Sequence, residues 1–290
     1  MREGFTVEEV LIEDERVVGI KGNSRHRNST IERARVVVGA DGLRSFVAEA
    51  GRPEHYDEKP PLCVAYYTYW SGLPMDGRFQ VYIRDRRAFA AMPTHEDLTL
   101  IIAEWLYAEF EENKKDIEGN YLNTSELVPA FADRLRGARR EARFVGMAVP
   151  NYFRKPYGPG WALVGDAGYN KDFITAQGIL DSFRDAELCA TAIDQSLSGA
   201  RPFEEAMGEY QRIRDADVGA MYDFTCDLAT LEPPPPELQR ILGAVHGNQA
   251  AMDGFARVNA GTISPTEFFA PENVEAIFAA AAERTQRMNA

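Results

Sequence analysis

Residues that build metal and disulfide sites are scarce in this sequence of 290 residues, which has 3 cysteines and 4 histidines. Cys63, Cys189 and Cys226 lie far apart, and neither a Cys-x-x-Cys nor a His-x-x-x-His pair occurs, so no metal-ligand spacing is present. An odd number of cysteines also argues against a secreted disulfide framework. We therefore expect no metal, and we expect a reducing, cytoplasmic setting.

Basic residues and long apolar runs are also in short supply. The chain carries 32 Lys and Arg against 45 Asp and Glu, a net charge of −13, which would repel nucleic acid and anionic lipid. No apolar run approaches the roughly twenty residues that a membrane helix needs, and the first residues resemble neither a signal peptide nor a transit sequence. We therefore expect neither nucleic acid nor a membrane as a partner.

A glycine-rich phosphate-binding loop is missing as well. No Gly-x-Gly-x-x-Gly occurs in the chain, although strand–turn–helix units that hold a dinucleotide pyrophosphate use that motif. Residues 5–12 already alternate like a strand, so regular structure is expected from the first residues onward. If the chain is built to hold a dinucleotide, its pyrophosphate-binding segment is expected to precede Met1.

What the sequence does contain is a mixture of strand and helix patterns, typical of an α/β chain of the mixed α+β kind. Strands are expected in a short antiparallel meander at residues 7–12, 17–21 and 31–38, with a polar loop at 23–29. A second antiparallel sheet is expected from residues 62–70, 79–84, 88–92 and 98–103, and further strands from 144–149 and 161–164. Helices are expected at residues 45–50, 104–115, 127–136, 174–197, 202–228, 237–245 and 271–287.

The strand expected at residues 62–70 concentrates aromatic side chains: Tyr66, Tyr67, Tyr69 and Trp70. Because alternate residues of a strand point to opposite faces, both faces should meet something bulky. Packing against helices and a wall for an apolar ligand explain this equally well.

The first motif that could bind a ligand follows residues Val36 to Val38. This apolar run is typical of a strand covered on both faces. This run leads into Gly39-Ala40-Asp41-Gly42 and so places Asp41 at the carboxyl end of the strand. A carboxylate flanked by open backbone could receive a ribose or pyrophosphate. For this motif alone we prefer the simpler interpretation, that Asp41 caps the helix that follows.

The second motif is more specific. The strand Trp161 to Val164 ends in Gly165-Asp166-Ala167-Gly168, and Gln177 and Gly178 then stand near the start of a long helix. A helix N-terminus offers free N–H groups and the positive end of its dipole, which stabilise an anionic ring or phosphate. Gly178 would let a flat ring approach the backbone. Ligand binding explains this unit better than packing alone.

Together, the two motifs resemble the group A FAD-dependent monooxygenases, the family of para-hydroxybenzoate hydroxylase. Residues 39–42 match its Asp-Gly motif, and residues 165–167, with 177–178 and 185–186, match its Gly-Asp motif. The resemblance spans residues 1–197 and implies FAD, with Asp166 on the ribityl chain and the following loop and helix around the isoalloxazine ring. The cofactor-binding residues that it implies are Asp41, Gly42, Gly165, Asp166, Ala167, Gln177 and Gly178.

The resemblance also implies a domain plan. A partial, Rossmann-like FAD/NAD(P)-binding domain would occupy residues 1–60 and continue at 151–200, an antiparallel substrate-binding sheet with helices would occupy 61–150, and a C-terminal helical region 201–290. The candidate substrate contacts are Tyr67, Tyr69 and Phe173. A homodimer is left open.

The implied activity is reduction of FAD by NAD(P)H and reaction with dioxygen to a flavin C4a-hydroperoxide, which oxygenates an aromatic or other apolar organic substrate. The cofactor carries this chemistry, so no catalytic side chain is assigned. The chain departs from the family in lacking the glycine motif, in having Phe173 for a proline and Gly168-Tyr169 for Ala-His, and in having Ala48 for an arginine.

Two other interpretations stay open. FAD-dependent reductases and halogenases share the fold, although the halogenase signature Trp-x-Trp-x-Ile-Pro is absent. Alternatively, the chain is a truncated, non-catalytic relative that acts as a binding module. The departures favour that interpretation, whereas the joint presence of Asp41, Asp166, Gln177 and Gly178 opposes it.

Overall fold

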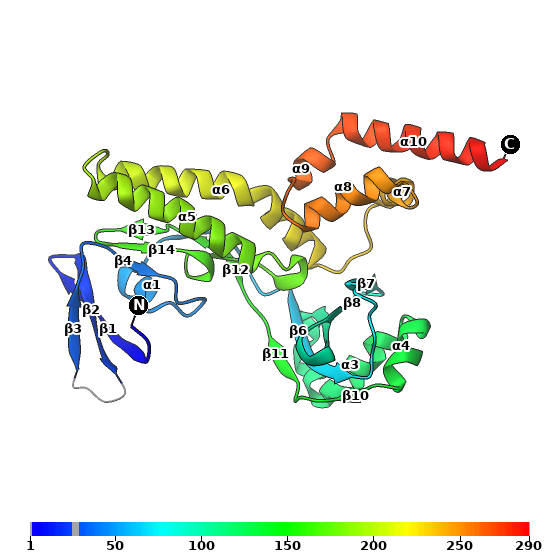
Figure 1. Ribbon diagram of the computed structural model, residues 1–290, viewed down its shortest axis with the longest axis horizontal. Coiled ribbons are helices and arrows are strands. Elements are labelled where there is room, and N and C mark those ends of the chain that lie inside the picture. The colour runs from blue at the N-terminus through cyan, green and yellow to red at the C-terminus, as the bar shows by residue number, and fades with distance from the viewer. Residues whose placement is uncertain (1, 25–28, 290) are drawn as a thin grey trace. The chain divides into compact units, whose positions relative to one another are not determined.

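The computed structural model of the chain describes residues 2–24 and 29–289. Two compact units are present: the first comprises residues up to 59 together with 151–222, and the second comprises 60–150 together with the residues from 223 onward. Each unit is thus assembled from separate stretches of sequence (Figure 1). Both mix helices with sheets, which confirms the predicted mixed α/β class. No helix of the described residues has the length and apolar character to cross a membrane.

The strands of the first unit form small sheets. One is antiparallel in the order β1-β2-β3 and consists of β1 (Phe5–Glu13), β2 (Arg16–Ser24) and β3 (Thr30–Arg33). Another has the order β15-β12-β5 and consists of β5 (His55–Lys59), β12 (Asn151–Arg154) and β15 (Tyr169–Asn170). A third has the order β13-β14-β4 and consists of β4 (Val37–Gly39), β13 (Tyr157–Gly158) and β14 (Trp161–Leu163).

The predicted meander is confirmed for its first strands, but the prediction of one strand over residues 31–38 is wrong. After β3, the Ala34 N–H donates to the Val18 carbonyl at 3.0 Å, and then the Val37 N–H donates to the Gly160 carbonyl at 2.9 Å. The chain therefore leaves β2 and pairs with β14 instead, in parallel. The polar loop expected at 23–29 includes residues 25–28, which lie outside the described residues.

The strand β14 is buried on both faces, as its apolar sequence predicts. Trp161 and Leu163 pack with Val47 and Ala48 of helix α1 (Phe46–Gly51). Ala162 and Val164 pack on the opposite side, against the core formed with α5 (Gly178–Leu197) and the start of α6 (Phe203–Leu228). Because consecutive residues of a strand point to opposite faces, helices on both sides bury every side chain of β14.

The neighbouring strand β4 differs, because it lies at the edge of its sheet and leaves Val38 42% exposed. The prediction that both of its faces are covered is therefore wrong.

Helix α5 also differs from the burial that its sequence predicts. The sequence pattern of this helix predicts one apolar face, formed by Ile179, Phe183, Ala186, Ala190 and Ile193. In the structure, however, Ile179 (77%) and Phe183 (73%) of that face are exposed, whereas Asp181 and Asp185 are buried. The first half of α5 thus buries its charged face and exposes its apolar one.

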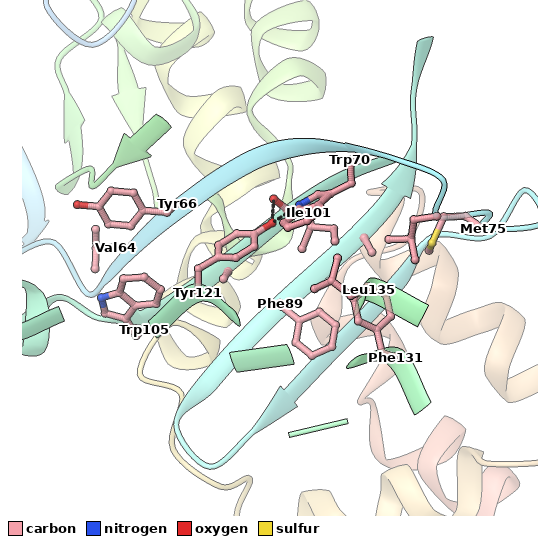
Figure 2. Close-up of a cluster of buried hydrophobic side chains, with 13 residues drawn as sticks. Val64, Tyr66, Trp70, Met75, Phe89, Ile101, Trp105, Tyr121, Phe131 and Leu135 are labelled. Carbon is pink, nitrogen blue, oxygen red and sulfur yellow. Dashed lines mark hydrogen bonds between the residues drawn. The ribbon is translucent and has the colours of Figure 1, made fainter. Parts of the chain in front are cut away.

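The second unit is built on an antiparallel sheet in the order β10-β6-β9-β8-β7, with β11 also paired to β6. Its strands are β6 (Cys63–Ser71), β7 (Gln80–Arg84), β8 (Arg87–Pro93), β9 (Thr99–Leu106), β10 (Arg139–Arg140) and β11 (Val145–Met147). This confirms the predicted four-stranded antiparallel sheet. Figure 2 shows the core on one face, where Tyr66, Trp70, Phe89 and Trp105 of the sheet meet Phe131 of helix α4 (Pro129–Arg136).

The helix predicted at residues 104–115 is wrong in its first part, because β9 continues to Leu106. Trp105 pairs with Val64 of β6 and is fully buried, so cross-strand pairing overrides the local helical preference. The remaining helices of this unit are α2 (Phe110–Asn113), α3 (Ile117–Glu126), α7 (Pro236–Val245), α8 (Gln249–Asn259), α9 (Pro265–Phe268) and α10 (Pro271–Asn289).

The contrast between β14 and α5 yields a stability prediction. Leu163→Ala should lower the free energy of unfolding by about 2–5 kcal/mol, because it empties a closed core position, whereas Phe183→Ser should change it by no more than about 0.5 kcal/mol, because its ring is exposed. Urea unfolding followed by circular dichroism measures both. Comparable losses in the two variants would contradict the exposure of the apolar face of α5.

Candidate functional site

The parallel pairing of β4 with β14 brings the two sequence motifs to one place. Gly39 pairs with Leu163, and the Val164 N–H donates to the Gly39 carbonyl at 3.0 Å. Asp41 comes two residues after Gly39 in the chain, and Asp166 comes three residues after Leu163. Because parallel strands end at the same edge of a sheet, where ligands of α/β proteins bind, both aspartates leave the sheet at one edge. Both are exposed.

Asp41 is partly committed to the helix behind it. Its Oδ2 accepts a hydrogen bond from the Phe46 N–H, at the first residue of α1, at 2.7 Å. Asp41 thus contributes to capping as preferred from the sequence, although the N-cap itself is Ser45, whose hydroxyl accepts from the Ala48 N–H at 3.0 Å. Within the described residues, the other carboxylate oxygen of Asp41 has no hydrogen-bond donor. Next to it, Gly42 has a φ of 74°, and a Cβ there would meet nothing within 4 Å. The backbone at this motif is thus open on one side.

Asp166 stands in the short 3-10 helix η4 (Gly165–Ala167), beside the start of α5. A Cβ on Gly165 would lie 2.6 Å from the Ser182 hydroxyl, and this glycine has a φ of 57°, so both close packing and backbone conformation require glycine there. A Cβ on Gly178 would have the Asp166 Oδ1 as its nearest neighbour, at 3.9 Å. The Asp166 carboxylate and the first turn of α5 therefore border the same open space. Ala167 is buried.

Gln177 is turned away from that space. Its side chain is 4% exposed and its Nε2 donates to the Thr175 carbonyl at 2.9 Å. The predicted helix at 174–197 accordingly begins later, because residues 173–175 form the 3-10 helix η5 (Phe173–Thr175) and Ala176 adopts a left-handed φ of 55°. The side chain of Gln177 therefore stabilises the turn that leads into α5. Phe173 is the first residue of η5, just before that turn.

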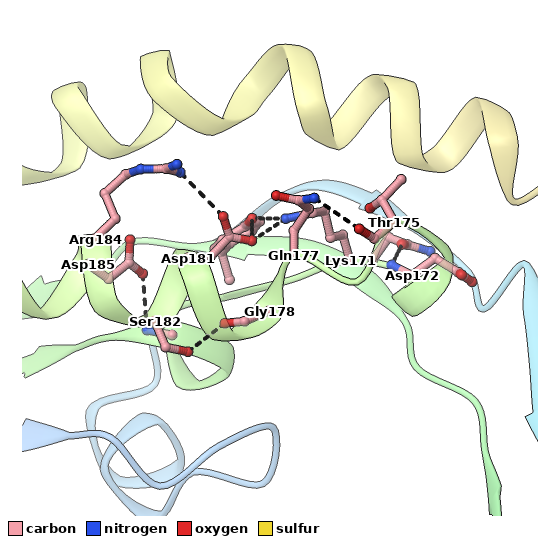
Figure 3. A network of polar contacts seen from close by, with 12 residues as sticks. Lys171, Asp172, Thr175, Gln177, Gly178, Asp181, Ser182, Arg184 and Asp185 are labelled. Carbon is pink, nitrogen blue, oxygen red and sulfur yellow. Dashed lines mark hydrogen bonds and ion pairs between the residues drawn. The ribbon is translucent and has the colours of Figure 1, made fainter. Parts of the chain in front are cut away.

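A buried charge network that the sequence analysis missed supports this turn (Figure 3). The Lys171 ammonium contacts the Asp181 carboxylate and the Tyr169 hydroxyl, and the Tyr169 hydroxyl donates to Asp181. The other Asp181 oxygen lies 3.3 Å from Nη1 of Arg184. Burial lowers the pKa of Lys171, although Asp181 opposes that shift. Because breaking a buried pair leaves an uncompensated charge, this network holds residues 169–171 firmly onto α5.

Asp185 connects the same helix to the second motif. Its Oδ2 accepts a hydrogen bond from the Gly165 N–H at 3.0 Å, and its side chain is fully buried. Burial raises the pKa of Asp185 to about 6, against the opposing effects of Arg214 and of the Gly165 N–H. Asp185 is therefore a positioning residue for the turn that presents Asp166. The signal in the sequence was the spacing of Asp181 and Asp185, four residues apart on one face of α5.

The other candidate residues, Tyr67 and Tyr69, lie in the second unit on the face of β6 opposite Tyr66 and Trp70. Their rings meet edge to face, with centroids 6.4 Å apart. Both are half-buried. The same sheet face also carries exposed apolar side chains on other strands, Val81 and Ile83 of β7 and Val145 and Met147 of β11. Tyr66 and Trp70, in contrast, belong to the core. The aromatic strand therefore serves packing on one face and offers an apolar surface on the other.

The residues at the edge of β4 and β14 fit part of a flavin. An exposed carboxylate on Asp166 suits ribityl hydroxyls, and the open first turn of α5 at Gly178 has N–H groups without intrahelical partners, which suit an electron-rich ring. A Cβ at Gly178 would enter the space where such a ring would approach the backbone. The fit concerns the ring and ribityl portion, because the chain contains no glycine-rich pyrophosphate loop.

No protein-family model and no curated protein sequence matches this chain. Its structure is similar to that of the flavin-dependent brominase Bmp2, with a TM-score of 0.74 and 17% identity over 98% of this chain and 70% of that one. The myxobacterial chondrochloren halogenase CndH is similar with a TM-score of 0.69 and 22% identity over 96% and 68% of the two chains. PqsL from Pseudomonas aeruginosa, a probable FAD-dependent monooxygenase, has a TM-score of 0.64 and 23% identity over 78% and 63%. The chain therefore has the fold shared by FAD-dependent halogenases and monooxygenases.

The buried Asp185 predicts a pH dependence of stability. Its pKa is about 6 in the folded chain against an ordinary value of 3.8, so between these values the folded state holds a proton that the unfolded state releases. Stability therefore falls as the pH rises from about 4 to 6. Asp185→Asn does not ionise and keeps an oxygen for the Gly165 N–H, so it should remove about 3 kcal/mol of that fall. Urea unfolding across this pH range measures it, and parallel curves for the two proteins would refute the assignment.

Proposed function

We propose that this chain acts as an FAD-dependent oxidoreductase that oxygenates an aromatic or other apolar organic substrate. The observation that carries the proposal is the convergence of Asp41 and Asp166 at one sheet edge, beside the open first turn of α5 at Gly178. The shared fold with FAD-dependent monooxygenases and halogenases supports the choice of cofactor. The group A monooxygenase family is the member of this fold that the two motifs resemble.

When bound, the flavin would supply the redox chemistry, taking electrons from NAD(P)H and passing them to dioxygen. The side chains of the site then bind and orient. Asp166 would accept hydrogen bonds from the ribityl chain, and Asp41 would offer its remaining oxygen. Gly42, Gly165, Ala167 and Gly178 would keep side chains out of the cofactor's path, and Gln177 would hold the turn that leads into α5.

The substrate would be recognised by apolar contact. Tyr67 and Tyr69 offer aromatic rings on the open face of the second unit's sheet. Phe173, in η5 of the first unit, is a separate candidate for contact with an apolar substrate. Rings of this kind bury large apolar areas and prefer stacked or edge-to-face partners, which suits an aromatic substrate. No side chain is assigned as an acid or base, and dioxygen would enter as the co-substrate.

Halogenation is a second candidate function. It is favoured by the similarity to the brominase Bmp2, whose TM-score of 0.74 exceeds the 0.64 of PqsL. It is disfavoured by the absence of Trp-x-Trp-x-Ile-Pro from the chain. The two functions differ in the atom that is added to the substrate, so product analysis separates them.

The role of Asp166 predicts a loss of flavin affinity. Asp166→Ala should raise the dissociation constant for FAD roughly tenfold or more, because it removes charge-assisted hydrogen bonds. The matched control is Asp194→Ala, an exposed aspartate further along α5, which should bind FAD as the wild type does. Flavin fluorescence titration measures all three. If the wild type binds no FAD, the flavin proposal fails, and if the two variants bind equally, Asp166 is not a ligand.

The reaction predicts the origin of the added atom. With FAD, a phenol and either NAD(P)H or flavin reduced chemically beforehand, the product should carry one oxygen atom from ¹⁸O-labelled dioxygen, as mass spectrometry detects. Turnover with NAD(P)H alone as reductant would support its direct use. A product that needs bromide and carries bromine would favour halogenation instead, and NAD(P)H oxidation that is insensitive to the removal of dioxygen would exclude both.

A further inference from the structure

A cavity in the second unit lies among its last three helices, α8, α9 and α10, which are drawn in orange to red (Figure 1). It has a volume of about 460 Å³, and its lining residues fall between positions 248 and 280. Sites for small organic molecules measure roughly 300–1,000 Å³. The candidate flavin site contributes no residue to this lining, so a ligand of this cavity would bind apart from the flavin.

The buried part of the lining is apolar. Phe268 and Ile277 are 2% and 5% exposed, and Ile263 lines the cavity with them. The helices on either side contribute short side chains: Ala250, Ala251 and Gly254 from α8, and Ala276 and Ala280 from α10. Longer side chains at these positions would fill the space between the two helices. The cavity therefore suits a small body that is itself apolar.

Two opposite charges line the same cavity without pairing with each other. Arg257 of α8 and Glu267 of α9 are both exposed, and within the described residues neither side chain has an ion pair or a hydrogen bond. Elsewhere on these helices an arginine near a carboxylate does pair, as Arg287 does with Glu283 at 3.6 Å. The guanidinium and the carboxylate at the cavity are thus available to ligand groups of opposite sign.

The backbone that carries these two charges is held by hydrogen bonds. The Arg257 carbonyl accepts from the N–H groups of Thr262 and Ile263, at 3.0 and 3.4 Å, which ties the loop after α8 to the end of that helix. The Glu267 N–H donates to the hydroxyl of Ser264, the N-cap of α9, at 3.0 Å. Less order is therefore lost on binding than at a loose surface loop.

Two asparagines add neutral polar groups to the lining. Asn248 uses its Oδ1 to accept from the Ala251 N–H at 3.3 Å, and Asn273 uses its Nδ2 to donate to the Phe268 carbonyl at 2.6 Å. For the part of the chain that the structure describes, these bonds leave the amide nitrogen of Asn248 and the amide oxygen of Asn273 to a ligand. The cavity thus offers one more donor and one more acceptor.

We propose that this cavity binds a small zwitterion, an α-amino acid with an aliphatic side chain. Arg257 would donate charge-assisted hydrogen bonds to its carboxylate, and Glu267 would accept them from its ammonium group. The short aliphatic lining suits an aliphatic rather than an aromatic side chain. Among the described lining residues Phe268 alone is aromatic, and its ring already contacts those of Phe255 and Phe269.

Calorimetric titration of the flavin-free chain with leucine tests the site. Two analogues each lack one charge: N-acetylleucine has no ammonium group, and leucinamide has no carboxylate. Leucine should bind roughly tenfold more tightly than either analogue, because each analogue loses one charge-assisted contact, and more tightly than tryptophan. Equal affinity for leucine and both analogues would contradict the two-charge recognition, and tighter binding of tryptophan would contradict the aliphatic preference.

Variants at the two charges separate direct contact from a defect in folding. Arg257→Ala should weaken leucine binding roughly tenfold and leave leucinamide unchanged, whereas Glu267→Gln should weaken leucine and leave N-acetylleucine unchanged. A folding defect would weaken every ligand alike. The control is Arg287→Ala, an exposed arginine further along α10 that pairs with Glu283, which should bind as the wild type does.

Ala276→Leu tests the cavity itself. Ala276 is an exposed residue of α10 and leucine is a good helix former, so this variant should keep its unfolding temperature while its longer side chain excludes leucine from the cavity. Failure of the wild-type chain to bind leucine at tens of millimolar would overturn the proposal. So would undiminished leucine binding by Ala276→Leu.

Discussion

The parallel pairing of β4 with β14 is the constraint on which the rest of the candidate site depends. A short ladder, with Gly39 beside Leu163, places two distant motifs at one edge. The ladder is secured from both sides, because the side chains of β14 alternate between the core around α1 and the core around α5 and α6. Burial on both faces fixes the register of the β4–β14 pairing, because a slip by one residue would move each side chain of β14 to the opposite face.

Helix α5 shows how the site is stiffened at the expense of ordinary packing. Its first half buries Asp181 and Asp185 instead of Ile179 and Phe183. The buried carboxylates are compensated by specific partners: Lys171 for Asp181, and the Gly165 N–H for Asp185. Hydrogen bonds of this kind make buried polar groups tolerable, but Oδ1 of Asp185 is buried with no hydrogen-bond partner among the described residues, and burial raises the pKa of this carboxyl. What this arrangement provides is a fixed turn between the end of β14 and the first residues of α5, where Asp166 and Gly178 stand.

Local sequence patterns predicted most of the helices and strands. They failed where contacts with residues distant in sequence determine the pairing of a strand or the buried face of a helix. The apolar residues 161–164 predicted the buried strand β14, and the helix expected at residues 202–228 is α6, which begins at Phe203. The partner of Val37 could not be predicted, because its choice between β2 and β14 depends on contacts over more than 120 residues. The apolar periodicity of α5 was visible, but it pointed to the wrong buried face, because the partners of Asp181 and Asp185 are only known in three dimensions. Similarly, Trp105 extends β9 through cross-strand pairs that no local preference reveals.

The central claim is that residues around β4 and β14 form one flavin-binding edge. It is tested most directly by backbone amide NMR of the deuterated chain during addition of FAD. The account predicts that the largest shift changes fall together on residues 41–42 and on 165–178, the segments that the β4–β14 pair brings to that edge. Changes confined to one of these segments, or spread over the second unit with neither affected, would contradict it.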